Sequence, residues 1–387
     1  MKVEFYRHNI SQKDIDNAVG VLNSLFLTTG EVVNEFEDKF SRYLGCRHTV
    51  GVNSCTAALH LSLLACGIGP GDEVITTPMT FISSANSIIY TGATPVFVDV
   101  EPETGNINAD FIESTITSKT KAILPVHLYG QMSDMRKIRE IADKHHLAVI
   151  EDAAHAIEAL RNGVRPGQLG DAACFSFYAT KNITSGEGGA VSTNNEEIAE
   201  KLKKLRLHGM SKAAAERYSK RYEHWDMEML GWKYNMSNIQ AALLLDQIEN
   251  IDRNWKRRES ICRMYEDAFM SNPHICLPKV LPSSKSARHL FTIQVHPAKR
   301  DEMLRQLQEK GIGVAVNFRA IHLLTFYRQT FGYQRGMYPI AERIGDGTIT
   351  LPLYPKLSDE EVRYVIKVVK DVTTSSGNVL GYHDGRA

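Results

Sequence analysis

The first two-thirds of the chain alternate short apolar runs with helical segments, and this alternation limits the fold more than any other feature. The apolar runs lie at 72–78, 94–100, 121–130 and 147–152, and a helical segment at 133–145 separates the last two. Parallel strands need a long crossover connection, which is usually a helix. This order therefore predicts an α/β fold with a mainly parallel central sheet and helices on both faces.

The remainder of the chain predicts a second, smaller unit. A strand at 190–194 and a helix near 195–206 precede a polar stretch, 209–230, which we expect to be a mobile surface loop. A long helical pattern at 235–269 follows, and we expect it to link the two units. We predict a large domain over 1–250 and a small α+β domain over 251–387, which holds a strand at 289–295 and a helix at 299–310.

Composition excludes several classes of function. The 387 residues, 43% of them hydrophobic, suffice for one large core and a smaller one. Lys plus Arg equals Asp plus Glu at 45 each, so no bulk charge favours nucleic acid or a membrane surface, and we expect neither as a partner. The six cysteines have no metal-ligand spacing, so no metal is expected and the thiols are typical of a reducing compartment.

The sequence has no signal for export or membrane insertion. Its start, MKVEFYRHNISQKD, contains no hydrophobic stretch of signal-peptide length. No later segment approaches the ~20 apolar residues of a membrane span. We therefore expect a cytoplasmic protein.

Lys181 ends an alternating aromatic run and precedes a turn rich in Thr, Ser and Gly, within the segment 174–193. This pattern is typical of a lysine held at the carboxyl end of a strand and directed into a site. There its amine can form a Schiff base with an aldehyde such as pyridoxal phosphate. The alternative is a surface lysine beside an ordinary turn, and two further segments argue against it.

The first of these segments ends in Asp152. The apolar run at 147–152 indicates a buried parallel strand whose carboxyl end opens into a crevice, and it passes into a small-residue stretch that contains His155. A carboxylate at this place can keep a pyridinium nitrogen protonated, which makes the ring an electron sink. Taken alone, Asp152 is better explained as a helix N-cap, worth ~1 kcal/mol.

The second segment, 49–75, is a strand that passes through Asn53, Ser54, Cys55 and Thr56 into a helix starting near Ala57. Free backbone N–H groups and hydroxyls at a helix N-terminus form an anion site suited to a cofactor phosphate. Ser176 can add a further hydroxyl. Simple capping by Ser54 or Thr56 is the alternative. Neither a Walker motif nor G-x-G-x-x-G occurs, so nucleotide triphosphates and dinucleotides lose their usual support.

Seven motifs together resemble one family. They are NSCTAALHLSL, PMTFISSANSI, TPVFVDV, EDAAHA, FSFYATKN with SGEGGAVST, LRLHGMSK and GWKYNMSNIQAALLLDQ. In this order they are similar to the DegT-type (DegT/DnrJ/EryC/StrS) sugar aminotransferases, pyridoxal-phosphate enzymes that aminate keto sugars on nucleotide carriers. The resemblance covers about residues 4–372. Within the family it is strongest to the C4 aminotransferases of UDP-4-keto sugars, of the 4-amino-arabinose and spore coat polysaccharide types.

The resemblance implies a type I aminotransferase fold and a homodimer with its sites at the interface. It implies that Lys181 is the Schiff-base lysine, that Asp152 is the pyridinium partner, and that Phe81 stacks on the cofactor ring. His155 stands where many members have Gln, near the phenolic oxygen of the cofactor, and imidazole can supply the same hydrogen bond. The expected cofactor ligands are Ser54, Thr56, Ala57, Phe81, Asp152, His155, Ser176 and Lys181.

Two stretches depart from the family pattern. Many members read G-x-N-x-R where this chain has Gly231 to Asn235, so Lys233 replaces an Asn that reaches the cofactor phosphate of the neighbouring subunit. A lysine can contact that phosphate as a point charge. Asn317 stands where many members have His. The candidate substrate ligands are Asn235, Asn317, Arg319 and His322.

The implied reaction is transfer of an amino group, with Lys181 as general base and acid. The compact spacing from Lys181 to GEGG (186–189) resembles C4-aminating members, which favours a UDP-linked 4-keto-6-deoxy sugar as substrate and L-glutamate as donor. A C3-keto sugar or a cyclitol such as scyllo-inosose remains an alternative. A dehydratase of this family usually has His in place of Lys181, and a non-catalytic regulator is expected to lose Lys181 or Asp152.

Overall fold

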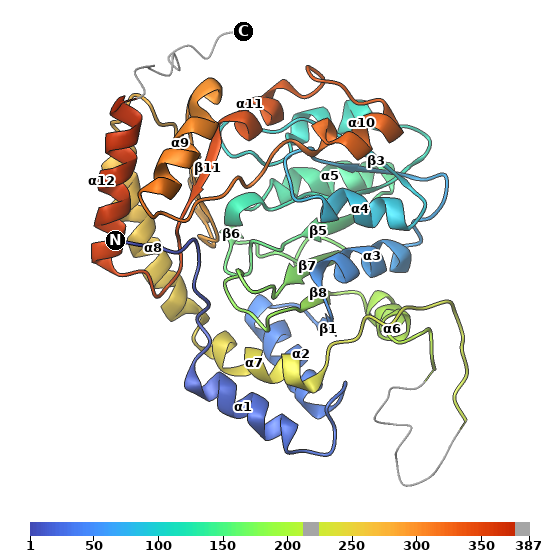
Figure 1. Cartoon of the computed structure of the whole chain (residues 1–387). Helices are drawn as coiled ribbons and strands as arrows, with labels where there is room; N and C mark the ends of the chain where they lie inside the picture. The colour runs from blue at the N-terminus through green and yellow to red at the C-terminus, as the bar shows by residue number, and fades with distance from the viewer. Residues whose placement is uncertain (212–223, 376–387) are drawn as a thin grey trace.

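A seven-stranded sheet forms the centre of the molecule in the computed structural model, which describes residues 1–211 and 224–375 (Figure 1). The strand order is β1-β8-β7-β5-β4-β2-β3. The bounds are β1 (His48–Val52), β2 (Glu73–Thr76), β3 (Thr94–Phe97), β4 (Thr120–Ile123), β5 (Ala148–Asp152), β7 (Ala172–Ser176) and β8 (Gly189–Thr193). Only β8 runs antiparallel to its neighbours, so the predicted mainly parallel sheet is confirmed.

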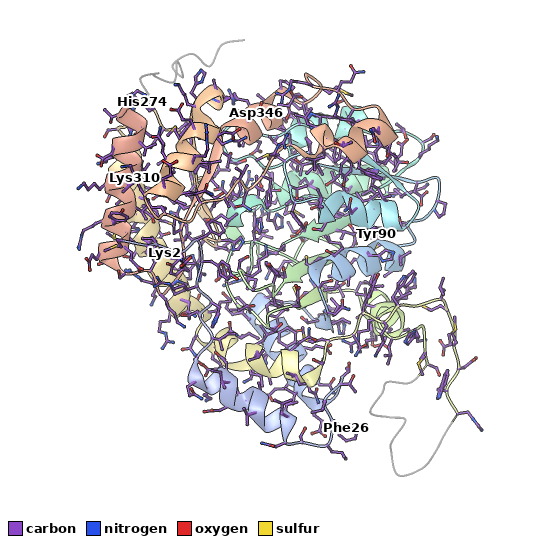
Figure 2. The ribbon with its side chains drawn as sticks, viewed as in Figure 1. Lys2, Phe26, Tyr90, His274, Lys310 and Asp346 are labelled. Atoms are coloured by element: carbon purple, nitrogen blue, oxygen red, sulfur yellow. The ribbon has the colours of Figure 1, made fainter. Side chains whose placement is uncertain are left out.

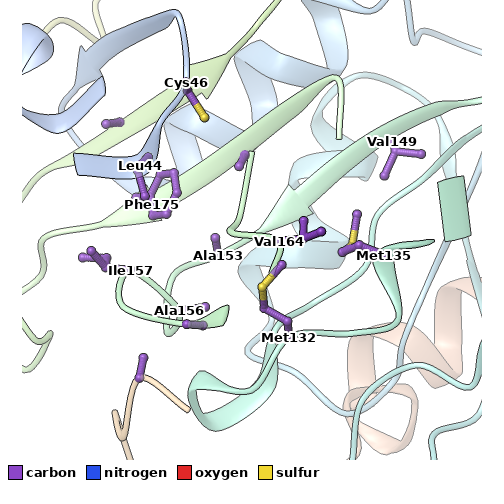
Figure 3. Close-up of a cluster of buried hydrophobic side chains, with 14 of the residues drawn as sticks. Leu44, Cys46, Met132, Met135, Val149, Ala153, Ala156, Ile157, Val164 and Phe175 are labelled. Atoms are coloured by element: carbon purple, nitrogen blue, oxygen red, sulfur yellow. The ribbon is translucent and has the colours of Figure 1, made fainter. Parts of the chain in front are cut away.

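Helices cover both faces of this sheet, because successive residues of the inner strands enter different cores. Val149 of β5 joins one cluster with residues of α2 (Glu31–Leu44), α5 (Met135–His145) and α7 (Asn238–Glu249). Ile150 joins the opposite cluster with residues of α3 (Cys55–Ala65) and α6 (Glu196–Leu205). Figure 3 shows the first cluster, in which Val149, Phe175 and Met135 lie on the same side of the sheet. Burial on both faces explains why the strands read as continuous apolar runs.

The observed strands are shorter than the apolar runs that predict them. β4 ends at Ile123, although the run continues to 130. Pro125 has no N–H to donate to a neighbouring strand, and the chain then enters the 3₁₀ turn η3 (Leu128–Gly130). The expected helices at 133–145 and 195–206 are present as α5 and α6, and the expected helix near Ala57 is α3.

The helical pattern at 235–269 is two helices in the structure, α7 and α8 (Ile251–Phe269). Ser237 caps the first one through a capping box with Gln240. Asn250 separates the two helices, and its Nδ2 donates to the Asp246 carbonyl at 2.9 Å. Asn favours such local bonds to the backbone, and this one satisfies a carbonyl that the end of α7 leaves open.

A second core lies beyond α7. It joins part of α8 to the two-stranded sheet β10 (Phe291–Gln294) and β11 (Thr348–Leu351), to α9 (Pro297–Glu309) and to α12 (Asp359–Ser375). Val3 from the N-terminal segment packs into the same core. Residues of α11 (Pro339–Gly347) pack instead against Met79 and Leu128 of the large sheet region. The domain boundary at residue 250 therefore stays a prediction.

The remaining elements lie around these cores. They are α1 (Gln12–Leu22), α4 (Ser83–Tyr90), α10 (Thr325–Phe331), η1 (Ala109–Phe111), η2 (Glu113–Thr115), η5 (Ile321–Leu323) and the short antiparallel pair β6 (Leu160–Arg161) and β9 (Ser284–Lys285). Of the expected loop at 209–230, residues 212–223 lie outside the described part of the chain, as do 376–387 of the expected small domain. No helix within the described residues is long and apolar enough to cross a membrane.

Phe40 of α2 tests how much the first core contributes to stability. It is fully buried, and its ring centroid lies 5.0 Å from that of Phe175 and 5.6 Å from that of Phe36. Phe40→Ala should lower the free energy of unfolding by about 3–5 kcal/mol in guanidinium titrations, because it removes these contacts and leaves a cavity. The matched Phe111→Ala, at a ring that is 53% exposed, should change it by only about 0.5 kcal/mol. Equal losses in the two variants would contradict this assignment of the core.

Candidate active site

A cavity of about 520 Å³ opens at the carboxyl ends of β5 and β7, beside the first turn of α3. Ligands of open α/β sheets bind at such carboxyl ends. Eight residues singled out from the sequence line this one cavity: Ser54, Thr56, Phe81, Asp152, His155, Ser176, Lys181 and Asn317. Within residues 1–211 and 224–375, no group of three or more His, Cys, Asp or Glu side chains could hold a metal ion.

The amine of Lys181 is enclosed by the cavity wall. Burial lowers the pKa of Lys181 to about 8, while the neighbouring Cys55 and Asp152 act in the opposite direction. The backbone N–H of Lys181 donates to the Tyr178 carbonyl at 2.9 Å, which holds the turn that follows β7. A lysine with this pKa has a substantial neutral fraction near pH 8, as a nucleophilic or proton-transferring amine requires.

Asp152 ends β5, and its carboxylate is buried and held by two donors. The Ser84 hydroxyl donates to Oδ2 at 2.7 Å and the Ala154 N–H donates to Oδ1 at 3.2 Å. Residues 153–159 form no helix, so the helix-cap interpretation of Asp152 does not apply. Burial raises the pKa of Asp152 despite these two donors. A cationic N–H placed beside the carboxylate would favour its charged form.

Hydroxyl groups gather where β8 meets the start of α3. Ser54 caps this helix, because the Ala57 N–H donates to the Ser54 Oγ at 3.1 Å; Ala57 itself does not line the cavity. A Cβ at Gly189 would lie 2.4 Å from the carbonyl carbon of Ser54, so only glycine permits β8 to approach this closely. Thr56 and Ser176 line the wall beside the capped helix, where hydroxyls can donate to an anion.

Aromatic rings form another part of the wall. Phe81 is 54% exposed although it lines the cavity, so one of its faces can cover a planar ligand. The ring of His155 lies parallel to that of Phe318, with centroids 5.8 Å apart and planes 8° apart. The buried Nδ1 of His155 has no hydrogen-bond partner, and a buried polar atom of this kind is commonly satisfied by a ligand or a water.

The charge state of His155 follows from its surroundings. Burial, and to a smaller extent the charge of Lys181, lower the pKa of His155 well below its usual range. A neutral imidazole offers one donor and one acceptor. His155 can therefore donate a hydrogen bond to a ligand oxygen without carrying a positive charge.

Two residues of the site were not predicted from the sequence. Ser84 of α4 holds Asp152, and this contact joins residues 68 positions apart. No local pattern signals a pairing over that distance. The other is His289, which lines the cavity beside Lys181.

Besides Ala57, four predicted ligands lie outside the cavity lining of their own chain. Lys233 is exposed and its Nζ donates to the Asn235 Oδ1 at 2.6 Å, while the Asn235 Nδ2 donates to the Thr29 Oγ1 at 2.7 Å. Arg319 is exposed. The side chain of His322 is 0% exposed and its Nε2 lies 3.0 Å from the Glu342 Oε1, so the structure places His322 in a packed core and not against a ligand in this cavity.

Comparison with known proteins agrees with this geometry. Residues 8–370 match the DegT/DnrJ/EryC1/StrS aminotransferase family. The chain is 45% identical to the spore coat polysaccharide biosynthesis protein SpsC of Bacillus subtilis, over 94% of this chain and 95% of that protein. It is 39% identical to a GDP-perosamine synthase of Caulobacter vibrioides, over 89% of this chain and 91% of the relative.

Solved structures give the same result. A putative sugar aminotransferase of Streptococcus pneumoniae in its PMP form superposes with a TM-score of 0.91 at 32% identity, over 97% of this chain and 100% of the other. The PLP form of the same protein gives a TM-score of 0.90, with 98% of this chain covered and 100% of the other. The type I aminotransferase fold and the pyridoxal phosphate cofactor expected from the sequence are confirmed.

The enclosed amine of Lys181 predicts a specific pH dependence. Cofactor-free protein mixed with pyridoxal phosphate should capture the aldehyde with a rate that rises with pH around a midpoint of about 8, since only the neutral amine attacks. An exposed lysine titrates near about 10.4. Stopped-flow absorbance over a pH series measures this rate, and a midpoint above about 10 would contradict the burial argument.

Proposed function

The chain belongs to the DegT/DnrJ/EryC1/StrS aminotransferase family, and we propose that it transfers an amino group from L-glutamate to C4 of a UDP-linked 4-keto-6-deoxy sugar. The observation that carries this proposal is the placement of the Lys181 amine and the Asp152 carboxylate in one cavity. Its relatives include a spore coat polysaccharide biosynthesis protein and a GDP-perosamine synthase, which supports a product used in a polysaccharide. The GEGG turn at 186–189 supports C4 as the position aminated.

The residues of the cavity fit pyridoxal phosphate. When bound, this cofactor supplies an aldehyde that condenses with amines and a ring that accepts electrons from a breaking C–H bond. Thr56 and Ser176 offer hydroxyls for the phosphate, and the exposed face of Phe81 covers the ring. The unpartnered Nδ1 of His155 is a free polar position for an oxygen on the ring.

Asp152 and Lys181 divide the chemical work. The carboxylate of Asp152, oriented by Ser84, holds a proton on the ring nitrogen. The Lys181 amine would remove a proton from the α-carbon of the donor and return it to the former aldehyde carbon of the cofactor, on the other side of the shared nitrogen, a task that suits a group whose pKa lies near the working pH. The same steps in reverse place the amino group on the keto sugar.

We further propose a homodimer in which Lys233 enters the cavity of the partner. Large apolar side chains are exposed in two segments: Leu25 is 87% exposed, and Leu230, three residues before Lys233, is 71% exposed. The bond from Asn235 to Thr29 ties these two segments together. An exposed apolar patch beside a lysine that does not line its own cavity fits an interface that completes the site. Figure 2 labels Phe26 of the same patch.

The state of the cysteines supports a cytoplasmic location. All six cysteines are free thiols, and four of them are buried. Proteins of oxidising compartments usually pair such residues in disulfides.

Asp152→Asn tests the role of the carboxylate. The variant should bind the cofactor but lose at least about 100-fold in kcat, equivalent to ~2.7 kcal/mol of transition-state stabilisation, because an amide does not hold the ring nitrogen protonated. Asp171 lies just before β7, at the amino end of that strand, whereas the cavity opens at the carboxyl end. The control variant Asp171→Asn should therefore keep most of its turnover. A near-normal rate for Asp152→Asn in a steady-state assay would show that the carboxylate only braces the local backbone.

Subunit mixing tests the shared site. Lys181→Ala and Lys233→Ala homodimers should both be inactive or nearly so, because each lacks one member of every site. Unfolding and refolding an equal mixture should restore about a quarter of the wild-type activity, since half of the dimers are then mixed and each has one intact site. Absence of any recovery, with mixed dimers shown by native mass spectrometry, would refute the contribution of Lys233 across the interface.

A substrate screen tests the proposed acceptor. With L-glutamate and a UDP-4-keto-6-deoxy-N-acetylhexosamine, the enzyme should release 2-oxoglutarate and a UDP-4-amino sugar, detected by mass spectrometry. Arg319→Ala should raise KM for the sugar nucleotide by about tenfold or more, the loss of one charge-assisted hydrogen bond, and leave the glutamate half-reaction nearly unchanged. Arg305→Ala, at an exposed arginine of α9, is the control. Turnover with scyllo-inosose but not with nucleotide sugars would replace this proposal with the cyclitol alternative.

A further inference from the structure

A chain of polar side chains leads from α8 to the cavity. Arg258 of α8 donates to the Glu158 Oε1, and the Asn182 Nδ2 donates to the Glu158 Oε2 at 2.7 Å. The Asn182 Oδ1 lies 3.0 Å from the His289 Nδ1. Arg258, Glu158 and His289 are buried, so these bonds are shielded from competing water.

This series of hydrogen bonds fixes which nitrogen of His289 carries the proton. Both hydrogens of the Asn182 amide are in use, because Nδ2 also donates to the Ala287 carbonyl at 3.0 Å. These two bonds fix the orientation of the amide, so that Oδ1 faces His289. An amide oxygen only accepts, and the His289 Nδ1 must therefore be the donor. In the neutral ring the Nε2 of His289 is then an acceptor. Burial, followed by the charges of Lys181, His155 and Arg258, lowers the pKa of His289 well below its usual range, so the ring is neutral.

His289 and Lys181 lie together in the walls of two separate spaces. Both residues line the main cavity, and both line a narrow crevice beside the N-terminal segment 6–9. The ring of His289 also packs against that of His155, with centroids 4.4 Å apart. The crevice has a volume of about 20 Å³, which is room for about one water and too little for a substrate. On the crevice side, His289 therefore has Lys181 as a neighbour and no room for a substrate.

We propose that His289 is a positioning residue whose Nε2 can accept a hydrogen bond from the Lys181 amine when that amine is not bonded to the cofactor. The inference rests on the proposed role of Lys181. A released lysine has a long flexible side chain, and an acceptor fixed by Asn182 and Glu158 holds its amine at the reacting carbon between the two proton transfers.

Other titratable or charged groups share these two spaces with the Lys181 amine. In the cavity they are Cys55, Asp152, His155, Tyr178 and Glu187, and in the crevice they are Tyr6, Arg7, His8, Arg258 and Tyr354. Because none of them is changed in the variants below, a shift in the titration of Lys181 reports on His289.

Two substitutions of His289 separate its two nitrogens. His289→Asn keeps a donor at the place of Nδ1, toward Asn182, but has no atom at the place of Nε2. His289→Gln is longer and can present its amide oxygen at the place of Nε2. A purely structural role requires the contact to Asn182, whereas the proposed role requires the acceptor that faces Lys181.

The readout is the pH midpoint for capture of pyridoxal phosphate by the cofactor-free variants. His289→Asn should lower this midpoint by about half a unit to one unit, because it removes an acceptor that favours the charged amine, and His289→Gln should stay within about 0.3 unit of wild type. In the loaded enzyme, His289→Asn should lower kcat by about tenfold with little change in KM for either substrate.

Four results would overturn the inference. An unchanged midpoint in His289→Asn, or equal shifts in the Asn and Gln variants, would assign His289 a structural role. The control His60→Phe removes a different buried histidine, and neither ring nitrogen of His60 has a hydrogen-bond partner. A shift of the pH midpoint in this control as large as in His289→Asn would also overturn the inference. If borohydride reduction of the wild type traps the cofactor on a lysine other than Lys181, the proposed function itself fails and this inference fails with it.

Discussion

Removal of the Lys181 amine from bulk water is the constraint on which the rest of the site depends. Burial brings its pKa to about 8, so that the amine can lose and regain a proton near physiological pH. The same enclosure raises the pKa of Asp152, whose charged form needs Ser84, Ala154 and a cationic partner to persist. A bound pyridinium would supply that partner. With the cofactor in place, the charge of the ring nitrogen would therefore balance that of Asp152.

The sheet produces this arrangement through the ends of its strands. β5 delivers Asp152 and β7 delivers Ser176 to one edge, and the turn after β7 carries Lys181. Gly189 lets β8 lie against the first turn of α3, where Ser54 is used for capping and Thr56 faces the cavity. Helices on both faces keep these ends in place through two apolar cores. The functional groups thus sit at termini of rigid elements, where small backbone movements are restrained by packing.

The sequence was sufficient for features with a local cause. Asp152, Ser176 and Lys181 stand at or just after the ends of apolar runs, and the carboxyl ends of parallel strands meet at the same edge of a sheet. The bond from Ser84 to Asp152 and the link from Asn182 to His289 join distant segments, and no periodicity reveals them. The burial of His322 against Glu342 depends on how α11 packs.

Local patterns also failed in one other way. The helical pattern at 235–269 did not show the break at Asn250, because a side chain that bonds to the backbone, and not the apolar spacing, ends α7. The role proposed for Lys233 depends on a second copy of the chain, and the family resemblance alone predicted it. Sequence motifs predicted the candidate cofactor ligands. The contacts that orient those side chains could be found only in the folded structure.

The central claim is that Lys181 carries the proton transfer, and a single half-reaction tests it most directly. Protein loaded with pyridoxal phosphate is mixed with L-glutamate alone, and the absorbance of the cofactor is followed while 2-oxoglutarate is measured. The wild type should convert completely to the pyridoxamine form with one 2-oxoglutarate released per site, whereas Lys181→Ala should bind L-glutamate without conversion. Conversion of Lys181→Ala at the wild-type rate would exclude Lys181 as the group that transfers the proton.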